Sequence, residues 1–231
     1  KLCTHISMNT VKKDIYVGRE NKKIKKKEAK SEYRKNQQRK YLVYFRYSLV
    51  YFNQENIIQY ANRPFKNVEQ MNQILVNNWN EVVGLNDIVF FLGDLGFFKN
   101  EAEIHDLIIR LRARIHFITG NHDQKIISAR KSYSHLFESV QDYEEISIDN
   151  IKVVLSHYPM LDWSDSFAGS FQLHGHVHSL RGDLENKCRR YDVGVDNNNY
   201  FPVNFEDIYK KLVYKPKMCI NTIRDGVPMR L

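Results

Sequence analysis

Five polar side chains have the types and the spacing of a metal centre. Four of them each follow an apolar run of strand length: Asp94, Asn121, His157 and His176. His178 comes two residues after the last of these, and alternate residues of an extended segment share a face, so both histidines can point at one centre. Such a mixture of nitrogen and oxygen ligands suits Mn²⁺, Fe or Zn²⁺ better than Ca²⁺. The set therefore predicts a centre for divalent metal ions, with Mn²⁺ the first choice.

Metal ions at such a centre suit the hydrolysis of phosphate esters. A metal lowers the pKa of bound water to about 7, and two ions about 3.5–4 Å apart can clamp the attacking and leaving oxygens. His122 adjoins Asn121, and Asp123 could orient the His122 ring or hold it protonated. A histidine near the scissile phosphate can stabilise the transition state and protonate the leaving oxygen. We therefore predict hydrolysis of a phosphomonoester or phosphodiester by metal-activated water, with His122 and Asp123 as catalytic residues.

Each of these residues also has a plainer explanation. Asp94 could be an ordinary turn aspartate, Asn121 a helix cap, and His157 a buried histidine with satisfied hydrogen bonds. The metal hypothesis rests on the joint pattern, because such pieces follow one apolar strand after another along the chain. Arg63 is a further candidate, since a guanidinium matches phosphate geometry, although a surface salt bridge would explain it equally well. With Asn121 and His122 it makes up the predicted substrate-binding set.

The elements that would position these residues alternate between strands and helices. Apolar residues recur at helical spacing from Val68 to Val83, with Asn67 and Gln70 placed as a capping box, and a second helix opens at Asn100. Short apolar runs predict strands over residues 41–45, 88–92, 115–119, 145–148, 151–155 and 191–195. This alternation predicts an α/β domain. Ligand sites of open α/β sheets lie just beyond the carboxyl ends of strands, so the metal-capable side chains are expected to converge.

Composition narrows the class of protein. The chain has 231 residues, 42% of them hydrophobic, which is enough for one sizeable core. No apolar run approaches the roughly 20 residues that cross a bilayer, so no membrane partner is expected, and the first residues lack the apolar stretch of a secretory signal. Cys3, Cys188 and Cys219 lie far apart, which argues against a disulfide framework and for a reducing compartment. We therefore predict a cytoplasmic protein.

The predicted domain boundary lies near residue 40. Residues 1–40 are polar and basic and are interpreted as an extension, followed by a domain over residues 41–231. The formal net charge is +8, and much of the excess lies between Arg19 and Lys40. Such a segment can be a solvated, partly disordered or helical arm, or it can follow the phosphates of a nucleic acid. Nucleic acid is thus a candidate partner beside the phosphate-ester substrate, which could itself be a nucleotide.

Four segments resemble the motifs of the calcineurin-like metallophosphoesterase superfamily, in particular its small bacterial and phage-type members. The segments are Gly93-Asp94-Leu95-Gly96, Gly120-Asn121-His122-Asp123, Ser156-His157-Tyr158-Pro159 and Gly175-His176-Val177-His178. The resemblance covers roughly residues 41–208 and implies a sandwich of two mixed β-sheets flanked by helices. It also implies that Asp94 bridges two metal ions. Asn121, His157 and His176 would complete one position, His178 would belong to the other, and His122 would act on the leaving group.

The resemblance fails at its first motif. Related chains read roughly S-D-x-H-F, where this chain reads Ser48-Leu49-Val50-Tyr51-Phe52. Leu49 cannot ligate a metal, and a neutral Tyr51 is a poor ligand. One ion would therefore be held firmly and a second more weakly. A second ion completed by water or substrate, or by Asp14 or His5 of the extension, is compatible with turnover. The alternative is a catalytically impaired relative that binds metal, phosphate or nucleic acid.

Overall fold

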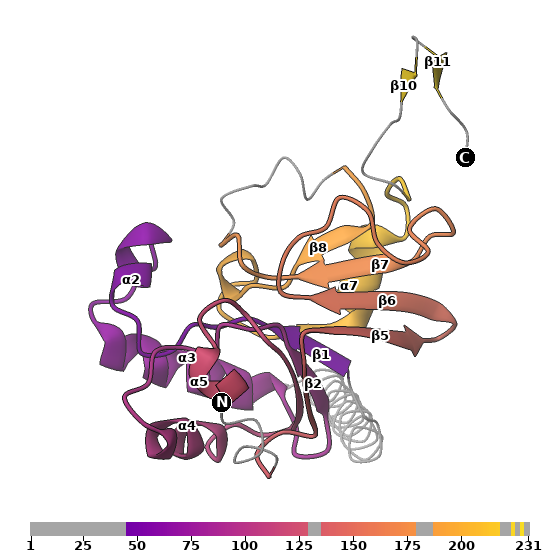
Figure 1. Ribbon diagram of the computed structural model, residues 1–231. Coiled ribbons are helices and arrows are strands. Elements are labelled where there is room, and N and C mark those ends of the chain that lie inside the picture. The colour runs from indigo at the N-terminus through magenta and orange to yellow at the C-terminus, as the bar shows by residue number, and fades with distance from the viewer. Residues whose placement is uncertain (1–44, 129–134, 179–186, 218–222, 225–226, 229–231) are drawn as a thin grey trace, which may run out of the picture. The chain divides into compact units, whose positions relative to one another are not determined.

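The computed structural model describes residues 45–128, 135–178, 187–217, 223–224 and 227–228. The predicted basic extension, residues 1–40, lies outside this range. Most of the described residues are arranged in two β-sheets with helices packed against them (Figure 1). Among the described helices, none has both the length and the apolar character needed to cross a bilayer.

The first sheet has the strand order β4-β3-β2-β1-β9. Its strands are β1 (Phe45–Ser48), β2 (Ile88–Phe91), β3 (Arg114–Ile118), β4 (Ser139–Gln141) and β9 (Val203–Asn204). The first four are mutually parallel, whereas β9 runs antiparallel to β1. The carboxyl ends of β1, β2 and β3 therefore lie at one edge of this sheet.

The second sheet has the order β5-β6-β7-β8. Its strands are β5 (Tyr143–Ile148), β6 (Ile151–Ser156), β7 (Phe171–His174) and β8 (Arg190–Asp192). The first two form the predicted antiparallel hairpin around Asp149 and Asn150, and the remaining pairs are parallel. Both sheets are thus mixed, which confirms the predicted two-sheet α/β sandwich. A separate two-stranded ladder joins β10 (Ile223–Arg224) and β11 (Val227–Pro228).

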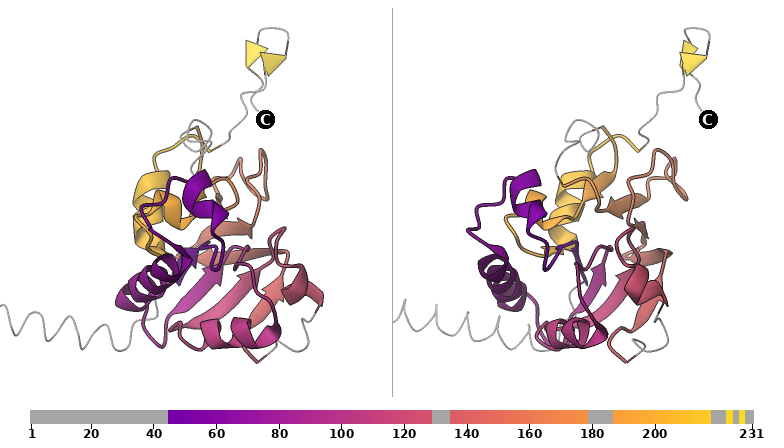
Figure 2. Two further views of the ribbon diagram at one scale, coloured as in Figure 1. Left: turned by 90° about the vertical axis from the view of Figure 1, so that its left-hand side faces the viewer. Right: turned by 60° about the vertical axis from the view of Figure 1, so that its left-hand side comes forward.

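Alternation along β2 shows how the layers pack. Val89 and Phe91 belong to one apolar cluster, which also contains residues of two helices, α3 (Val68–Val82) and α4 (Glu101–Ile108). Phe90 and Leu92 belong to a second cluster with residues of β6, β7 and α7 (Phe205–Leu212). Successive strand residues face opposite sides of a sheet. The first sheet is therefore covered by α3 and α4 on one face and by the second sheet on the other (Figure 2).

Side-chain caps begin the two predicted helices. The Asn67 side chain accepts a hydrogen bond from the Gln70 N–H at 2.9 Å, and Gln70 Oε1 accepts one from the backbone of Lys66 at 2.7 Å. Asn100 accepts from the Glu103 N–H in the same way at 3.1 Å. These bonds satisfy backbone donors that have no partner within the helix, so both predicted helix starts are confirmed. The shorter helices α2 (Asn56–Tyr60) and α5 (Gln124–Ser128) and the 3₁₀ turn η1 (Val195–Asn197) lie in connections.

The first strand leads into the segment that departs from the D-x-H pattern. The described β1 covers Phe45–Ser48, and residues 41–44 of the strand predicted over 41–45 lie outside the described residues. Leu49 and Tyr51 therefore follow the carboxyl end of β1. Cys188 is fully buried, and the other two cysteines, Cys3 and Cys219, lie outside the described residues.

Candidate metal centre

Connections at the carboxyl ends of four strands hold the predicted metal ligands. Asp94 follows β2, Asn121 follows β3, His157 directly follows β6, and His176 follows β7. The first two strands belong to the first sheet and the other two to the second. The ligands therefore meet where the ends of the two sheets come together, as the strand-end argument predicts.

Glycines before two of the ligands allow this close approach. A Cβ atom on Gly93, whose φ is 86°, would lie 2.6 Å from His157 Nδ1 and 2.7 Å from the Gly120 nitrogen. A Cβ atom on Gly120 would lie 2.4 Å from Asp94 Oδ1. No real side chain tolerates such distances, so glycine is required at both positions. This explains why each ligand, Asp94 and Asn121, is preceded by a glycine.

Three potential ligand groups converge around the Nε2 atom of His157, which is itself the fourth. This atom lies 3.0 Å from Asn121 Oδ1, 3.1 Å from Asp94 Oδ2 and 3.2 Å from His176 Nδ1. The ligand atoms of Asp94, His157 and His176 all lie within 4.8 Å of one another. The structure thus brings together the four residues that the sequence assigned to one metal position. Together they form a group that could bind a metal ion.

The tautomer of His157 suits such a role. Its Nδ1 lies 2.8 Å from the carbonyl oxygen of Leu92. A carbonyl only accepts hydrogen bonds, so Nδ1 carries the proton and the Nε2 lone pair faces the cluster. Metal-binding histidines are commonly oriented in this way by a backbone carbonyl. Burial by itself lowers the pKa of His157, but the neighbouring Asp94 carboxylate outweighs it and raises that pKa.

Asp94 is the most heavily contacted of the ligands. It is fully buried, its Oδ1 accepts the backbone N–H of His122 at 2.8 Å, and its Oδ2 faces His157. Burial alone would raise the pKa of this carboxyl. The bonds and charge of His157, the Tyr51 hydroxyl and the His122 N–H reverse that effect and leave the pKa of Asp94 below its ordinary value. Asp94 is therefore held as a carboxylate, the form that binds metals.

His122 and Asp123 occupy different environments. His122 is exposed, and its ring centroid lies 5.2 Å from that of Phe97. Asp123 is buried, and its carboxylate accepts the backbone N–H groups of Asp94, Leu95 and Gly120 at 2.7 to 3.0 Å. Burial and the nearby Asp94 carboxylate raise the pKa of Asp123, although its backbone hydrogen bonds oppose this rise. Asp123 thus joins the loop after β2 to the loop after β3 through backbone hydrogen bonds, and none of these bonds involves the His122 ring. The catalytic role of Asp123 stays a prediction.

Tyr51 and Leu49 fill the region where the first motif would have supplied ligands. The buried Tyr51 hydroxyl donates a hydrogen bond to Asp94 Oδ2, and its ring centroid lies 4.7 Å from that of His178. Burial, then the Asp94 carboxylate, raises the pKa of Tyr51 far above its ordinary value. Leu49 is fully buried, and a Cβ atom on Gly175 would lie 2.1 Å from Leu49 Cδ1. Both side chains are therefore packed into the site.

A buried ion pair lies behind His178. Arg63 Nε and Nη2 donate to the two carboxylate oxygens of Asp196 at 2.7 and 2.9 Å, and the Arg63 side chain is fully buried. His178 Nδ1 lies 2.9 Å from Asp196 Oδ2, and Arg63 Nη1 donates to the Val50 carbonyl at 3.1 Å. The geometry favours a structural role for Arg63, since its guanidinium is committed within the protein. The substrate-binding prediction for this residue stays untested.

Sequence reasoning missed Asp196. It lies 133 residues from Arg63 and 18 from His178, in no recognised motif. A buried arginine needs a carboxylate partner, so burial of Arg63 would have pointed to a nearby acidic residue. The sequence does not show that Arg63 is buried, and Asp196 therefore could not be assigned from it.

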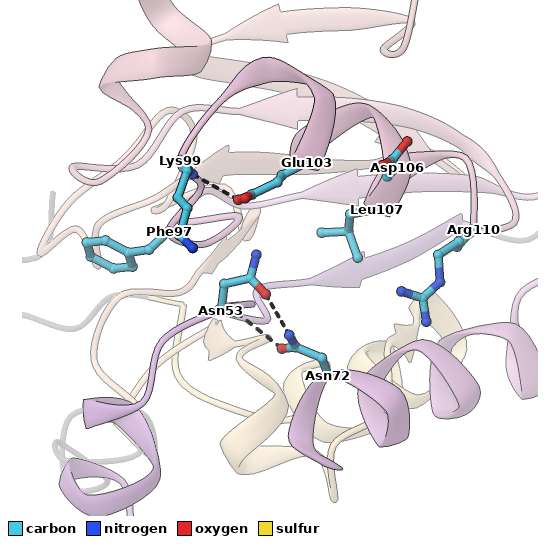
Figure 3. Close-up of a pocket in the computed structure, with 8 residues that line it drawn as sticks. All are labelled: Asn53, Asn72, Phe97, Lys99, Glu103, Asp106, Leu107 and Arg110. Carbon is cyan, nitrogen blue, oxygen red and sulfur yellow. Dashed lines mark hydrogen bonds between the residues drawn. The ribbon is translucent and has the colours of Figure 1, made fainter. Parts of the chain in front are cut away.

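An open pocket with a volume of about 440 Å³ lies next to Phe97, which lines it. Phe97 and Lys99 line it from the connection after β2, Asn53 from the connection after β1, and Asn72 and Arg110 from the helical side (Figure 3). The Asn72 amide donates to Asn53 Oδ1 at 2.6 Å and accepts from the Asn53 backbone at 3.1 Å. Phe97 contacts the His122 ring and also lines the pocket, so the two features adjoin.

Comparisons with known proteins place the chain in a family. No protein-family model matches it. It is 38% identical over 180 residues to the uncharacterized protein MJ1445 of Methanocaldococcus jannaschii, a match that covers 76% of this chain and 93% of the relative. It is 30% identical over 147 residues to the Gene 66 protein of Mycobacterium phage D29, with 53% of this chain and 73% of the relative covered. The chain belongs to the family of these proteins.

A solved structure supports the fold. The protein of unknown function AQ665 from Aquifex aeolicus superposes with a TM-score of 0.59 at 22% identity, over 73% of this chain and 99% of that one. The structure of a novel archaeal phosphodiesterase gives a TM-score of 0.32 at 15% identity, which is too low to establish a common fold. The two-sheet sandwich is therefore shared with AQ665, and the activity must be argued from the site.

Proposed function

We propose that the protein hydrolyses a phosphomonoester or phosphodiester at a divalent metal centre and is a calcineurin-like metallophosphoesterase. The observation that carries the proposal is the convergence of Asp94, Asn121 and His176 on His157 Nε2. Two oxygen and two nitrogen donors fit Mn²⁺, Fe or Zn²⁺. A bound ion of this kind would polarise a phosphate oxygen and supply a nucleophile at neutral pH.

His122 is the chain's candidate proton donor. Its ring is exposed beside the cluster, while its backbone N–H is bonded to the Asp94 carboxylate. This bond fixes the loop through the backbone of His122 and does not use its ring. A protonated imidazole so placed would give its proton to the leaving oxygen and stabilise the charge that develops there.

The pocket beside Phe97 is the proposed place for the organic part of the substrate. Phe97 is 44% exposed and offers an apolar face next to His122, while amide, carboxylate and cationic groups line the rest. A volume of about 440 Å³ is within the range of pockets for small molecules. A nucleotide is one candidate, since a base can stack on an aromatic ring. Nucleic acid binding by residues 1–40 remains a separate proposal.

The test is hydrolysis of p-nitrophenyl phosphate and bis-p-nitrophenyl phosphate by metal-stripped protein to which Mn²⁺, Zn²⁺ or Fe²⁺ is returned. Turnover that appears with metal and disappears with chelator is expected. A folded protein that shows no turnover with any divalent metal, at high concentration, would overturn the hydrolase proposal and favour a binding role. The packing of Tyr51 against Asp94 is the specific observation behind that second candidate.

Phe97→Ala is expected to weaken the use of substrates with a ring next to the phosphate. Loss of one stacking face costs about 1–3 kcal/mol, so kcat/KM should fall about 5- to 150-fold for a ring-bearing ester. A small alkyl ester of phosphate should be affected much less. The exposed Tyr60→Ala variant, on α2, is the matched control. An equal loss on both kinds of ester would show that the pocket does not hold the leaving group.

A further inference from the structure

The Asp94 oxygen that faces the metal cluster is shared with Tyr51. Oδ2 lies 3.1 Å from His157 Nε2 and also accepts the Tyr51 hydroxyl. In a centre with two cations, a bridging carboxylate oxygen would direct one lone pair at each ion. Here one lone pair is directed at the cluster and the other at a phenol proton. The hydrogen of the Tyr51 hydroxyl therefore occupies the side of Asp94 Oδ2 at which a second cation would bind.

The surroundings of Tyr51 hold it in this position. Tyr51 is 4% exposed and has a φ of 61°, a conformation that tyrosine adopts only when its surroundings impose it. The carbonyl of the preceding residue, Val50, accepts a hydrogen bond from Arg63, and Leu49 pairs with Gly194 across the two sheets. The Leu49 carbonyl also accepts the Val195 N–H at 3.1 Å. The backbone on the N-terminal side of Tyr51 is thus fixed.

The same network holds His178. Asp196 lies two residues after Gly194, the residue that pairs with Leu49. Both of its carboxylate oxygens accept hydrogen bonds from Arg63, and Oδ2 also faces His178 Nδ1. The Arg63 guanidinium is always charged, and its two hydrogen bonds pair with Asp196 as a carboxylate. Nδ1–H of His178 donates a hydrogen bond to this carboxylate, so the lone pair of the ring lies on Nε2. His178 is thereby oriented as a metal ligand, although Tyr51 packs against its ring.

We infer that Tyr51 closes the second metal position, so that the protein holds one divalent ion per chain. Arg63 and Asp196 are the positioning residues that keep the closed arrangement. Asp94 and the oriented His178 remain ready to bind a second ion once an imidazole replaces the phenol. This inference rests on the metal centre of the proposed function, but it concerns ion number and not turnover.

The test counts Mn²⁺ ions in wild type and in two variants by elemental analysis and calorimetry, with electron paramagnetic resonance to detect coupled ions. Wild type is expected to bind one ion and show the spectrum of an isolated Mn²⁺. Tyr51→His should bind a second, weaker ion with a spin-coupled spectrum. Adding His178→Ala to that variant should remove the second ion only. Tyr51→Phe, which keeps the ring but not the hydroxyl, should still bind one.

Three results would overturn the inference: two ions of similar affinity in wild type, a folded Tyr51→His variant that gains no ion, or loss of an ion in Tyr51→Phe. The last would show that the phenol is itself a ligand. Tyr51→Phe keeps the packed ring, so it remains informative if Tyr51→His fails to fold. Ion number and hydrolysis separate the two proposals, because one ion without turnover sinks only the hydrolase and two ions with turnover sink only the closure by Tyr51.

Discussion

His157→Ala is expected to abolish the metal centre. The other three ligand groups surround His157 Nε2. The substitution therefore removes the central one of the four metal ligands. Partners outside the coordination sphere are already worth about 10- to 100-fold in affinity, so loss of a ligand should weaken Mn²⁺ binding by more than about 100-fold. Metal-dependent hydrolysis should fall with it. Calorimetric titration with Mn²⁺ measures the first effect directly.

The same substitution has a structural cost that must be separated from the metal effect. The Leu92 carbonyl would lose its hydrogen bond from His157 Nδ1, at a cost of about 1–3 kcal/mol for a buried acceptor left unsatisfied. Thermal unfolding of the metal-free proteins measures this term. His105→Ala, on the exposed side of α4, is the matched control and should change neither stability nor metal affinity appreciably. A His157→Ala variant that keeps wild-type Mn²⁺ affinity would contradict the assigned centre.

His122→Ala is expected to act on chemistry and to leave metal binding intact. Its backbone N–H, which holds Asp94 Oδ1, is present in any substituted residue, and its ring is exposed. General acid catalysis is worth about 10²- to 10⁴-fold. The loss in kcat should reach that range for an alkyl phosphate, whose leaving oxygen needs a proton. It should be below about 10-fold for p-nitrophenyl phosphate, whose leaving group departs as an anion.

This dependence on the leaving group is the informative readout. Gln124→Ala, an exposed change at the start of α5, serves as the control on the same loop. Equal losses on alkyl and aryl esters would show that His122 stabilises charge on the phosphate without donating a proton. Unchanged rates on both would remove His122 from the catalytic residues. Mn²⁺ affinity close to that of wild type is required for either interpretation.

Local pattern was sufficient for much of the fold. The apolar runs that became β2, β3, β5 and β6 have a strand's length and are bounded by turn residues, and the caps of α3 and α4 are short-range features. Aromatic and β-branched residues recur from residue 41 to residue 47, and the described β1 takes Phe45–Ser48. Propensity alone does not decide where such a run pairs.

The candidate ligands were also accessible from the sequence, for a physical reason. A ligand placed directly after a strand inherits its position from that strand, and parallel strands end at a common edge. Asp94 and Asn121 therefore needed no long-range information beyond the pairing of β2 with β3. His157 and His176 follow the paired strands β6 and β7 in the same way.

Packing between the two sheets decided the rest. The sequence identified the metal-capable side chains and the departure at Leu49 and Tyr51, because residue type and spacing are local properties. Only the tertiary structure placed the Tyr51 hydroxyl on the shared oxygen of Asp94 and buried Arg63 against Asp196. The first contact joins two residues that are 43 positions apart in the sequence, and the second joins two that are 133 positions apart. Both depend on how the ends of the two sheets meet, and no periodicity along the chain encodes that arrangement.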